Sequence, residues 1–220
     1  FKMPAAIEGL LAIHLETADK GQENSKPASP LLLIQLDKES EKIIPRVTDY
    51  EVADSGSYVA GEQVKDPKDS LGANQVFLFA GESASIKTIA RGGNDFRSFV
   101  FSRDGQQLVF IAERDARPKE LVKYFKLYHY KSQADSSLLL IDRYTPGMKL
   151  GFTVSEFGKP RFSKSGQRLY FGTAPIRSAA DTSLPEIDQV KVDIWHYNDD
   201  YLQTQQLYNL KRDLEKSFLA

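Results

Sequence analysis

Two stretches of this chain, FSRDGQQLVF at residues 101–110 and FSKSGQRLYF at residues 162–171, carry nearly the same ten residues. Each places β-prone aromatic and aliphatic residues on both sides of a short polar segment that ends in glycine. Glycine accepts the positive φ that tight hairpins require, and Asp or Ser side chains hydrogen bond within such turns. Each stretch therefore predicts a β-hairpin, and we interpret the serine and charged residues as serving the turn.

A weaker third copy, YEVADSGSYVAGE at residues 50–62, has Gly56 in the predicted turn. Further pairs of apolar, β-prone segments follow the copies: 75–79 with 85–90, 124–130 with 137–142, and 190–195 with 205–210. Upstream, residues 12–15, 31–36 and 42–44 are also expected to be strands. Short strands in groups of four that repeat every 45 to 60 residues or so are typical of propeller blades.

The predicted fold is therefore all-β, a β-propeller of about four four-stranded blades that forms a partial circle. The blades are expected near residues 5–45, 46–91, 95–143 and 157–220, as one segment covering 1–220. The alternative is an all-β sandwich whose hairpins share similar turns. Polar segments at 18–29, 65–74 and 174–188 predict loops. Apolar residues near helical spacing over 207–219 allow a terminal helix in place of the last strand.

Composition limits the possible functions. The formal net charge is −1, which argues against binding to nucleic acid. The absence of cysteine excludes disulfides, thiolate zinc sites and cysteine catalysis. The longest aliphatic runs, 31–34 and 138–141, are far too short to span a membrane. Because the chain opens FKMPAAIEG, we expect it to be a piece of a longer protein.

No motif of catalysis or cofactor binding emerges, and we predict no catalytic, cofactor-binding or metal-binding residue. The string nearest to a G-x-S-x-G serine elbow, GESAS at residues 81–85, lacks the second glycine, and the three histidines are His14, His129 and His196. A metal site at 188–200 would use Asp193, His196, Asp199 and Asp200, but their spacing matches no known metal-binding loop, so a solvated loop is the favoured interpretation. Paired carboxylates of a glycosidase remain only a background alternative.

Arginines around a propeller's central opening are candidates for peptide binding, although each also fits an ordinary surface charge. The candidates are Arg97, Arg114, Arg117 and Arg143.

Two longer strings, FSKSGQRLYFGTAPI and VKVDIWHYNDDYLQTQQ, closely resemble the N-terminal β-propeller of bacterial prolyl oligopeptidase family proteins of the Bacteroidetes type. TDYEVADSGSYVAGE and GMKLGFTVSEFGKPRFSKSGQ fit the same region in the same order. The resemblance covers most of the chain and is most specific over 162–206; the S-x-D/S-G repeat alone is generic to TolB-like propellers.

The resemblance implies a parent serine peptidase in which this segment is the non-catalytic propeller. Its expected roles are to gate the access of peptide substrates and to dock a C-terminal α/β-hydrolase domain that carries Ser, Asp and His. It also implies a periplasmic or secreted location. Family propellers usually have more than four blades, so we expect this arc to expose blade edges. Either two copies associate through these edges or the four blades close imperfectly on themselves. The alternative function is a TolB-like propeller that serves as a protein-interaction scaffold with no peptidase attached.

Overall fold

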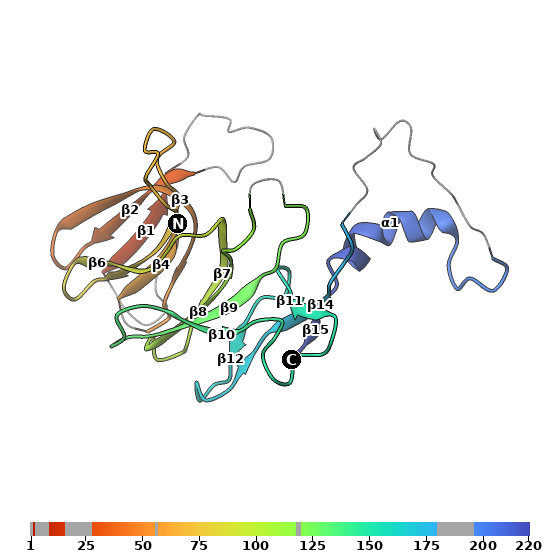
Figure 1. The fold of residues 1–220 in the computed structure, drawn as a ribbon. Helices are drawn as coiled ribbons and strands as arrows, with labels where there is room; N and C mark the ends of the chain where they lie inside the picture. Colours follow the sequence, from red (N-terminus) through yellow and green to blue (C-terminus); the bar gives the residue numbers. More distant parts are fainter. Residues whose placement is uncertain (1, 3–8, 16–27, 56, 118–119, 180–195) are drawn as a thin grey trace.

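The computed structural model describes residues 2, 9–15, 28–55, 57–117, 120–179 and 196–220 (Figure 1). The described residues form one helix and four antiparallel sheets. The first sheet holds β1 (Leu10–His14), β2 (Ser29–Gln35), β3 (Ser40–Val52), β4 (Tyr58–Gln63), β5 (Gln75–Ala80) and β6 (Ser85–Arg91). The second holds β7 (Asp95–Phe101), β8 (Gln107–Glu113), β9 (Lys126–Lys131) and β10 (Leu138–Ile141).

The remaining strands are short. β11 (Phe152–Val154), β14 (Gly172–Pro175) and β15 (Phe218–Leu219) form the third sheet, and β12 (Arg161–Phe162) with β13 (Leu169–Tyr170) forms the fourth. Helix α1 (Gln203–Leu214) precedes β15. Neighbours along the chain pair within the first two sheets, as in the meander of a propeller blade.

Strand β3 belongs to two layers of the molecule. Its first part, up to Val47, pairs with β2, and its second part pairs with β4. Arg46 has φ +55 at this junction, and the register with β4 shifts between Val47 and Asp49. Such irregularities bend a strand and increase its twist, so one continuous strand can serve two differently oriented layers. The predicted blade limit at 45/46 falls inside this strand.

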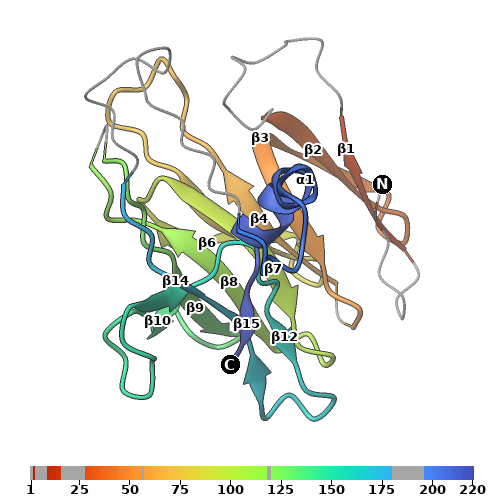
Figure 2. The ribbon, with the colours of Figure 1, turned by 90° about the vertical axis from the view of Figure 1, so that its right-hand side faces the viewer.

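The strands form four layers, of which the first two lie together at the left of Figure 1, the third in the middle and the fourth to its right. They are β1–β2 with the first part of β3, the second part of β3 with β4–β6, then β7–β10, and finally β11–β15. In Figure 2, β7 lies between β3 and β12, and it contacts both of these strands. These blade-like layers confirm the all-β, propeller-type architecture, whereas the predicted residue limits of the blades remain a prediction.

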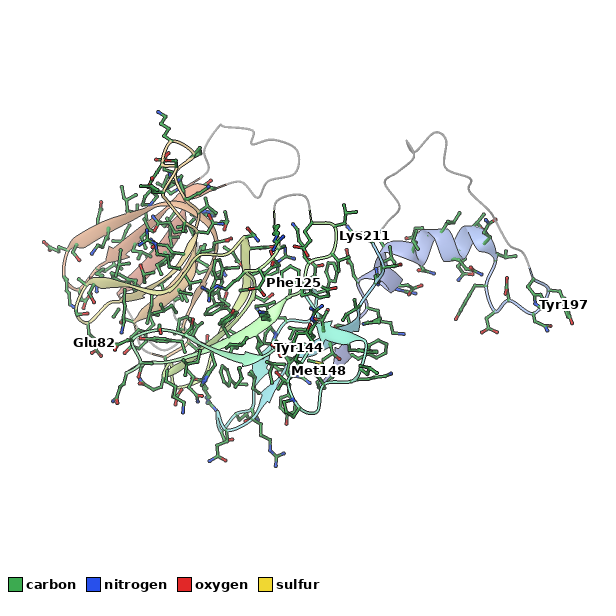
Figure 3. All side chains as sticks on the ribbon, in the orientation of Figure 1. Glu82, Phe125, Tyr144, Met148, Tyr197 and Lys211 are labelled. Carbon is green, nitrogen blue, oxygen red and sulfur yellow. The ribbon has the colours of Figure 1, made fainter. Side chains whose placement is uncertain are left out.

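Three hydrophobic clusters lie between the four layers. Leu10, Leu33 and Phe77 belong to the cluster between the first and second layers. Phe96 and Phe110 of the third layer pack on side chains of β4–β6 in the next cluster. The last cluster joins β8 and β9 to the fourth layer through Phe125, and Figure 3 shows Phe125 between these layers. Sheet-on-sheet burial of apolar side chains therefore stabilises every layer contact.

The hairpins and most predicted strands are confirmed. β1 with β2, β5 with β6, and β9 with β10 form the expected antiparallel pairs. Two details differ: β3 extends the first sheet to six strands, and the last layer is divided between a three-stranded and a two-stranded sheet. The predicted strand at 190–195 lies outside the described residues.

The predicted strand at 205–210 is wrong, because this segment lies inside α1. Leu207, Leu210 and Leu214 recur at a spacing of three and four, which places them on one side of a helix rather than on alternating faces of a strand. None of the helix's residues is buried, and Figure 1 shows α1 standing apart from the sheets. The helical alternative is therefore correct for 203–214, while Phe218 and Leu219 return to the sheet as β15.

Candidate functional site

The two similar stretches form equivalent hairpins. In the first, the amide of Gly105 donates to the carbonyl of Ser102 at 2.9 Å, and Gly105 has φ +71. In the second, the amide of Gly166 donates to the carbonyl of Ser163 at 2.9 Å, and Gly166 has φ +70. Both glycines occupy the left-handed region that other residues enter at a cost. The positive φ inferred from the sequence is therefore present at both turns.

The serine hydroxyls serve the turns, as the sequence indicates. Ser102 Oγ accepts the amide of Gln107 at 2.9 Å and also bonds the Asp104 carboxylate, which accepts the Gln106 amide at 3.1 Å. These hydrogen bonds, the one from Ser102 above all, lower the pKa of Asp104. At the second turn Ser163 Oγ accepts the amide of Arg168 at 3.1 Å. These polar side chains are thus used by local structure.

The hairpin turns of successive layers lie side by side. Gln107 Nε2 donates to the carbonyl of Gly166 at 3.2 Å, which links the third and fourth layers. A Cβ atom built on Gly105 would lie 2.2 Å from the carbonyl oxygen of Ser55, which belongs to the third, weaker copy. The corresponding turn glycine, Gly56, lies outside the described residues. A shallow cavity of about 320 Å³ between the turns is lined by Ser55, Arg103, Asp104, Lys164, Ser165 and Gly166.

The strands that precede these turns, β3, β7 and β12, lie at the edges of their layers, and β7 contacts both β3 and β12. Beside β3 and β7 lies a cavity of about 430 Å³, which we call the inner opening. Most of its lining residues are polar or charged, and they carry charges of both signs. Its lining residues are Lys2, Thr48, Asp49, Tyr50, Glu51, Arg97, Ser98, Phe99 and Lys159.

Lys2 closes one side of the inner opening. Its ammonium donates to the carbonyl of Tyr50 at 2.8 Å and to Glu51 Oε2 at 2.7 Å, and it lies 4.8 Å from the centre of the Tyr50 ring. Burial is the main reason why the pKa of the Tyr50 phenol is raised. This side of the opening is therefore lined by the ion pair of Lys2 with Glu51 and by the uncharged ring of Tyr50.

Arg97 forms the other charged wall. Nη1 pairs with Glu156 Oε2 at 2.7 Å and Nη2 pairs with Asp95, while the guanidinium lies 4.8 Å from the centre of the Phe125 ring. Burial alone would lower the pKa of Arg97, but the two carboxylates outweigh it and raise the pKa. The neighbouring Ser98 has φ +57 at an irregularity in β7. Arg97 thus ties β7 to the segment after β11 and is held in one orientation.

Of the four candidate arginines, only Arg97 is among the residues that line the inner opening. Arg114 donates to the carbonyls of Gly92 at 3.0 Å and Arg91 at 2.7 Å. Arg143 lies between Tyr124 and Tyr144, 3.8 and 4.6 Å from their ring centres, and Arg117 is exposed.

The residues considered for catalysis and metal binding have structural contacts. His14 Nε2 lies 2.9 Å from the carbonyl of Val47, and His129 Nε2 lies 3.0 Å from Gln107 Oε1. Residues 81–84 form the turn between β5 and β6, so the GESAS string is part of a hairpin rather than a strand-to-helix elbow.

Around the third histidine, the main-chain amide of His196 donates to Asp199 at 3.2 Å, and Asp193 lies outside the described residues. Within the described ranges, no three His, Asp or Glu side chains are grouped as metal ligands would be. No helix in the described part of the chain is long and apolar enough to cross a membrane.

Comparisons with known proteins add little beyond the fold. No family model matches the sequence, and no curated protein matches it. Three solved structures are similar: the tricorn protease (15% identity, TM-score 0.35), the β-propeller domain of the Trilobed protease from Pyrococcus furiosus (13%, 0.34) and the acylaminoacyl peptidase of Pyrococcus horikoshii (12%, 0.43).

The matches cover 46%, 77% and 79% of this chain and span 11%, 62% and 30% of those three chains, respectively. At these identities and TM-scores, the likenesses carry no argument about function. The class of the protein, an all-β chain of propeller-type layers, rests on its own sheets and on the clusters between them.

Proposed function

We propose that this chain is the non-catalytic β-propeller part of a serine peptidase of the prolyl oligopeptidase type. In this proposal it gates the access of peptide substrates and docks an α/β-hydrolase domain of the parent protein. The strings within 162–206 carry the resemblance to that family, and the packing of β7 against both β3 and β12 agrees with it.

The inner opening is the observation that best supports a gating role. An extended peptide has backbone donors and acceptors and side chains of either charge, and the lining of the opening offers partners for each kind of group. Arg97 and Lys2 are already engaged by carboxylates, so the wall is fixed before any ligand arrives. An opening with walls fixed in this way would select peptides by size and by lack of structure rather than by one side chain.

The coding sequence downstream of Ala220 tests the proposal most directly. We expect a G-x-S-x-G motif placed between a strand and a helix, followed by Asp and His. A stop codon shortly after Ala220 would refute the peptidase assignment and favour the protein-interaction scaffold. A periplasmic or secreted parent is part of the same proposal, and a signal peptide in the full reading frame would support it.

Assays on proteins of two lengths provide a biochemical test. The isolated 220-residue chain should release no chromophore from a chromogenic Gly-Pro peptide, whereas the full-length protein should hydrolyse it and react with a fluorophosphonate probe. Short peptides should be cleaved and a folded protein of similar sequence content should not. Turnover by the isolated chain would overturn the assignment of a non-catalytic role.

A further inference from the structure

Arg143 has surroundings unlike those of the other candidate arginines. Its guanidinium lies between two aromatic rings, 3.8 Å from the centre of Tyr124 and 4.6 Å from the centre of Tyr144. Arg97 is paired with two carboxylates, and Arg114 donates to two main-chain carbonyls. Arg143, by contrast, has no carboxylate within ion-pair distance among the residues that the structure describes. Its charge is therefore held in place by tyrosines, and no described acid neutralises it.

The pairing of β9 with β10 brings the arginine and the two rings together. Because these strands are antiparallel, the chain just before β9 and the chain just after β10 meet at the same end of the third layer. Tyr124 comes from the first of these segments, and Arg143 and Tyr144 come from the second. The turn after β10 is closed by Asp142, whose carboxylate accepts the amide of Tyr144 and the hydroxyl of Thr145, both at 2.9 Å. Arg143 is thus positioned by strand pairing and by a closed turn before any ligand arrives.

A cavity of about 180 Å³ lies beside this arginine, and we call it the Arg143 cavity. The other charged groups at its wall already have polar partners in the described structure: Glu113, Asp115, Glu120, Lys126 and Asp142. Asp115 pairs with Lys126, and the almost fully buried Glu113 accepts three N–H groups. Among the described groups of this wall, Arg143 is therefore the cation that can still take a partner of opposite charge.

The size and the lining of the Arg143 cavity limit what it can hold. Sites for drug-sized ligands measure about 300–1,000 Å³, so a cavity of about 180 Å³ has room for about one amino-acid residue. Val122, Tyr124 and Phe125 add apolar and aromatic surface to the charged wall. The carboxylates at the wall repel a doubly charged anion such as phosphate more strongly than a singly charged one. The ligand that fits is thus a single residue with one negative charge and an apolar part.

We propose that Arg143 binds the carboxylate of a single peptide residue, whose apolar atoms lie in the Arg143 cavity. With Tyr124 and Tyr144 on either side, the guanidinium keeps its N–H donors at the edge, where the planar fork matches the two oxygens of a carboxylate. The carboxylate can belong to the C-terminus of a peptide or to an acidic side chain. Arg143 does not line the inner opening, so this site is separate from the gating proposed above and needs no hydrolase domain.

Titrations of the 220-residue chain followed by amide NMR spectra test the proposal. N-acetylphenylalanine carries a C-terminal carboxylate, the α-amide of N-acetylaspartate carries a side-chain carboxylate, and N-acetylphenylalanine amide carries none. For a ligand of about fifteen non-hydrogen atoms we expect a dissociation constant on the order of 1 mM. One or both of the charged probes should shift the amide signals of Tyr124, Arg143 and Tyr144, and the probe that does so identifies the source of the carboxylate. The neutral probe should bind about 10-fold more weakly or less.

Variants at the site separate charge from geometry. Arg143→Gln keeps a planar polar group without the charge and should weaken carboxylate binding about 10-fold or more. Arg143→Lys keeps the charge without the fork, so its affinity should lie between those of the wild type and Arg143→Gln. Tyr144→Leu removes one of the two rings and should weaken binding about 2–5-fold. Arg103→Gln is the matched control, since Arg103 is exposed in the first hairpin turn and should leave binding unchanged.

Several results would overturn the proposal. One is the absence of shifts at these amides with both charged probes up to about 20 mM. Others are equal affinities for the charged and neutral probes, tighter binding of inorganic phosphate than of either charged probe, or equal effects of Arg143→Gln and Arg103→Gln. Unchanged amide signals of β8 and β9 show that a variant is folded; where Arg143→Gln is not, Arg143→Lys and the neutral probe decide the outcome.

Discussion

Replacement of Gly105 or Gly166 by alanine separates two roles of the repeated hairpin. The two glycines have nearly the same φ, +71 and +70, so alanine should meet the same conformational cost of about 1–2 kcal/mol at both positions. Their surroundings differ. A Cβ at Gly105 would lie 2.2 Å from the Ser55 carbonyl oxygen, which belongs to the backbone, whereas at Gly166 the nearest atom is the flexible Gln107 Nε2 at 3.3 Å.

A heavy atom 2.2 Å from a carbonyl oxygen forces one of the two turns to move, and such overpacking costs about 1–3 kcal/mol more. Gly105→Ala should therefore cost about 2–5 kcal/mol in all, and Gly166→Ala about 1–2 kcal/mol. For a chain of this size each kcal/mol lowers the melting temperature by about 2–4 °C. Thermal unfolding followed by circular dichroism should show a clearly larger decrease for Gly105→Ala.

Asparagine variants isolate the steric contribution to the destabilisation, because asparagine tolerates the left-handed region better than alanine does. Gly166→Asn should be close to wild type, while Gly105→Asn should remain destabilised by the contact with Ser55. Equal melting temperatures for the Gly105 and Gly166 variants would refute the reasoning that the turns of successive layers are packed against each other.

Other predictions concern the core and acid stability. Phe110 is fully buried and stacks on Tyr128 with ring centres 5.6 Å apart. Phe110→Ala should therefore lower the free energy of unfolding, measured in urea, by about 3–5 kcal/mol. Phe157 is 50% exposed, so Phe157→Ala should lower it by less than about 1 kcal/mol. The hydrogen bonds to Asp104 lower the pKa of its carboxyl group in the folded protein. The carboxylate therefore stabilises the fold at pH values above its unfolded pKa of about 3.9, and this stabilisation is lost as the pH falls through the lower folded pKa. Asp104→Asn should accordingly reduce the loss of melting temperature between about pH 4 and pH 2, and an unchanged acid slope would contradict the role given to the Ser102 hydrogen bond.

The local hairpins could be predicted because their determinants are close together in the sequence. Gly105 follows a polar turn between two apolar runs, and only glycine enters its φ without cost, so neither the turn nor its register depends on distant residues. The same reasoning failed at 205–210, where a short apolar pattern fits either a strand or a helix until the periodicity of Leu207, Leu210 and Leu214 is weighed.

The contacts of the candidate site, in contrast to the hairpins, could not be predicted from local sequence. Arg97 and Arg143 look alike in the sequence, but Arg97 reaches Glu156, fifty-nine residues away, while Arg143 lies between its chain neighbour Tyr144 and Tyr124. No local pattern could have distinguished them, because the ion pair exists only once the third and fourth layers have packed. Ser98 is likewise an ordinary polar residue in the sequence, and its φ of +57 follows from the irregularity in β7.

The sequence by itself thus determined the all-β class, the position of the two described hairpin turns and the roles of their serines, since these depend on residues within one or two turns of each other. Tertiary structure decided that β3 runs through two layers, that the turns at Ser55, Gly105 and Gly166 meet, and that Arg97 faces the inner opening. The reason is that packing between layers joins residues far apart in the chain, and its geometry follows from the bend of β3 and the fit of whole sheets rather than from any single stretch.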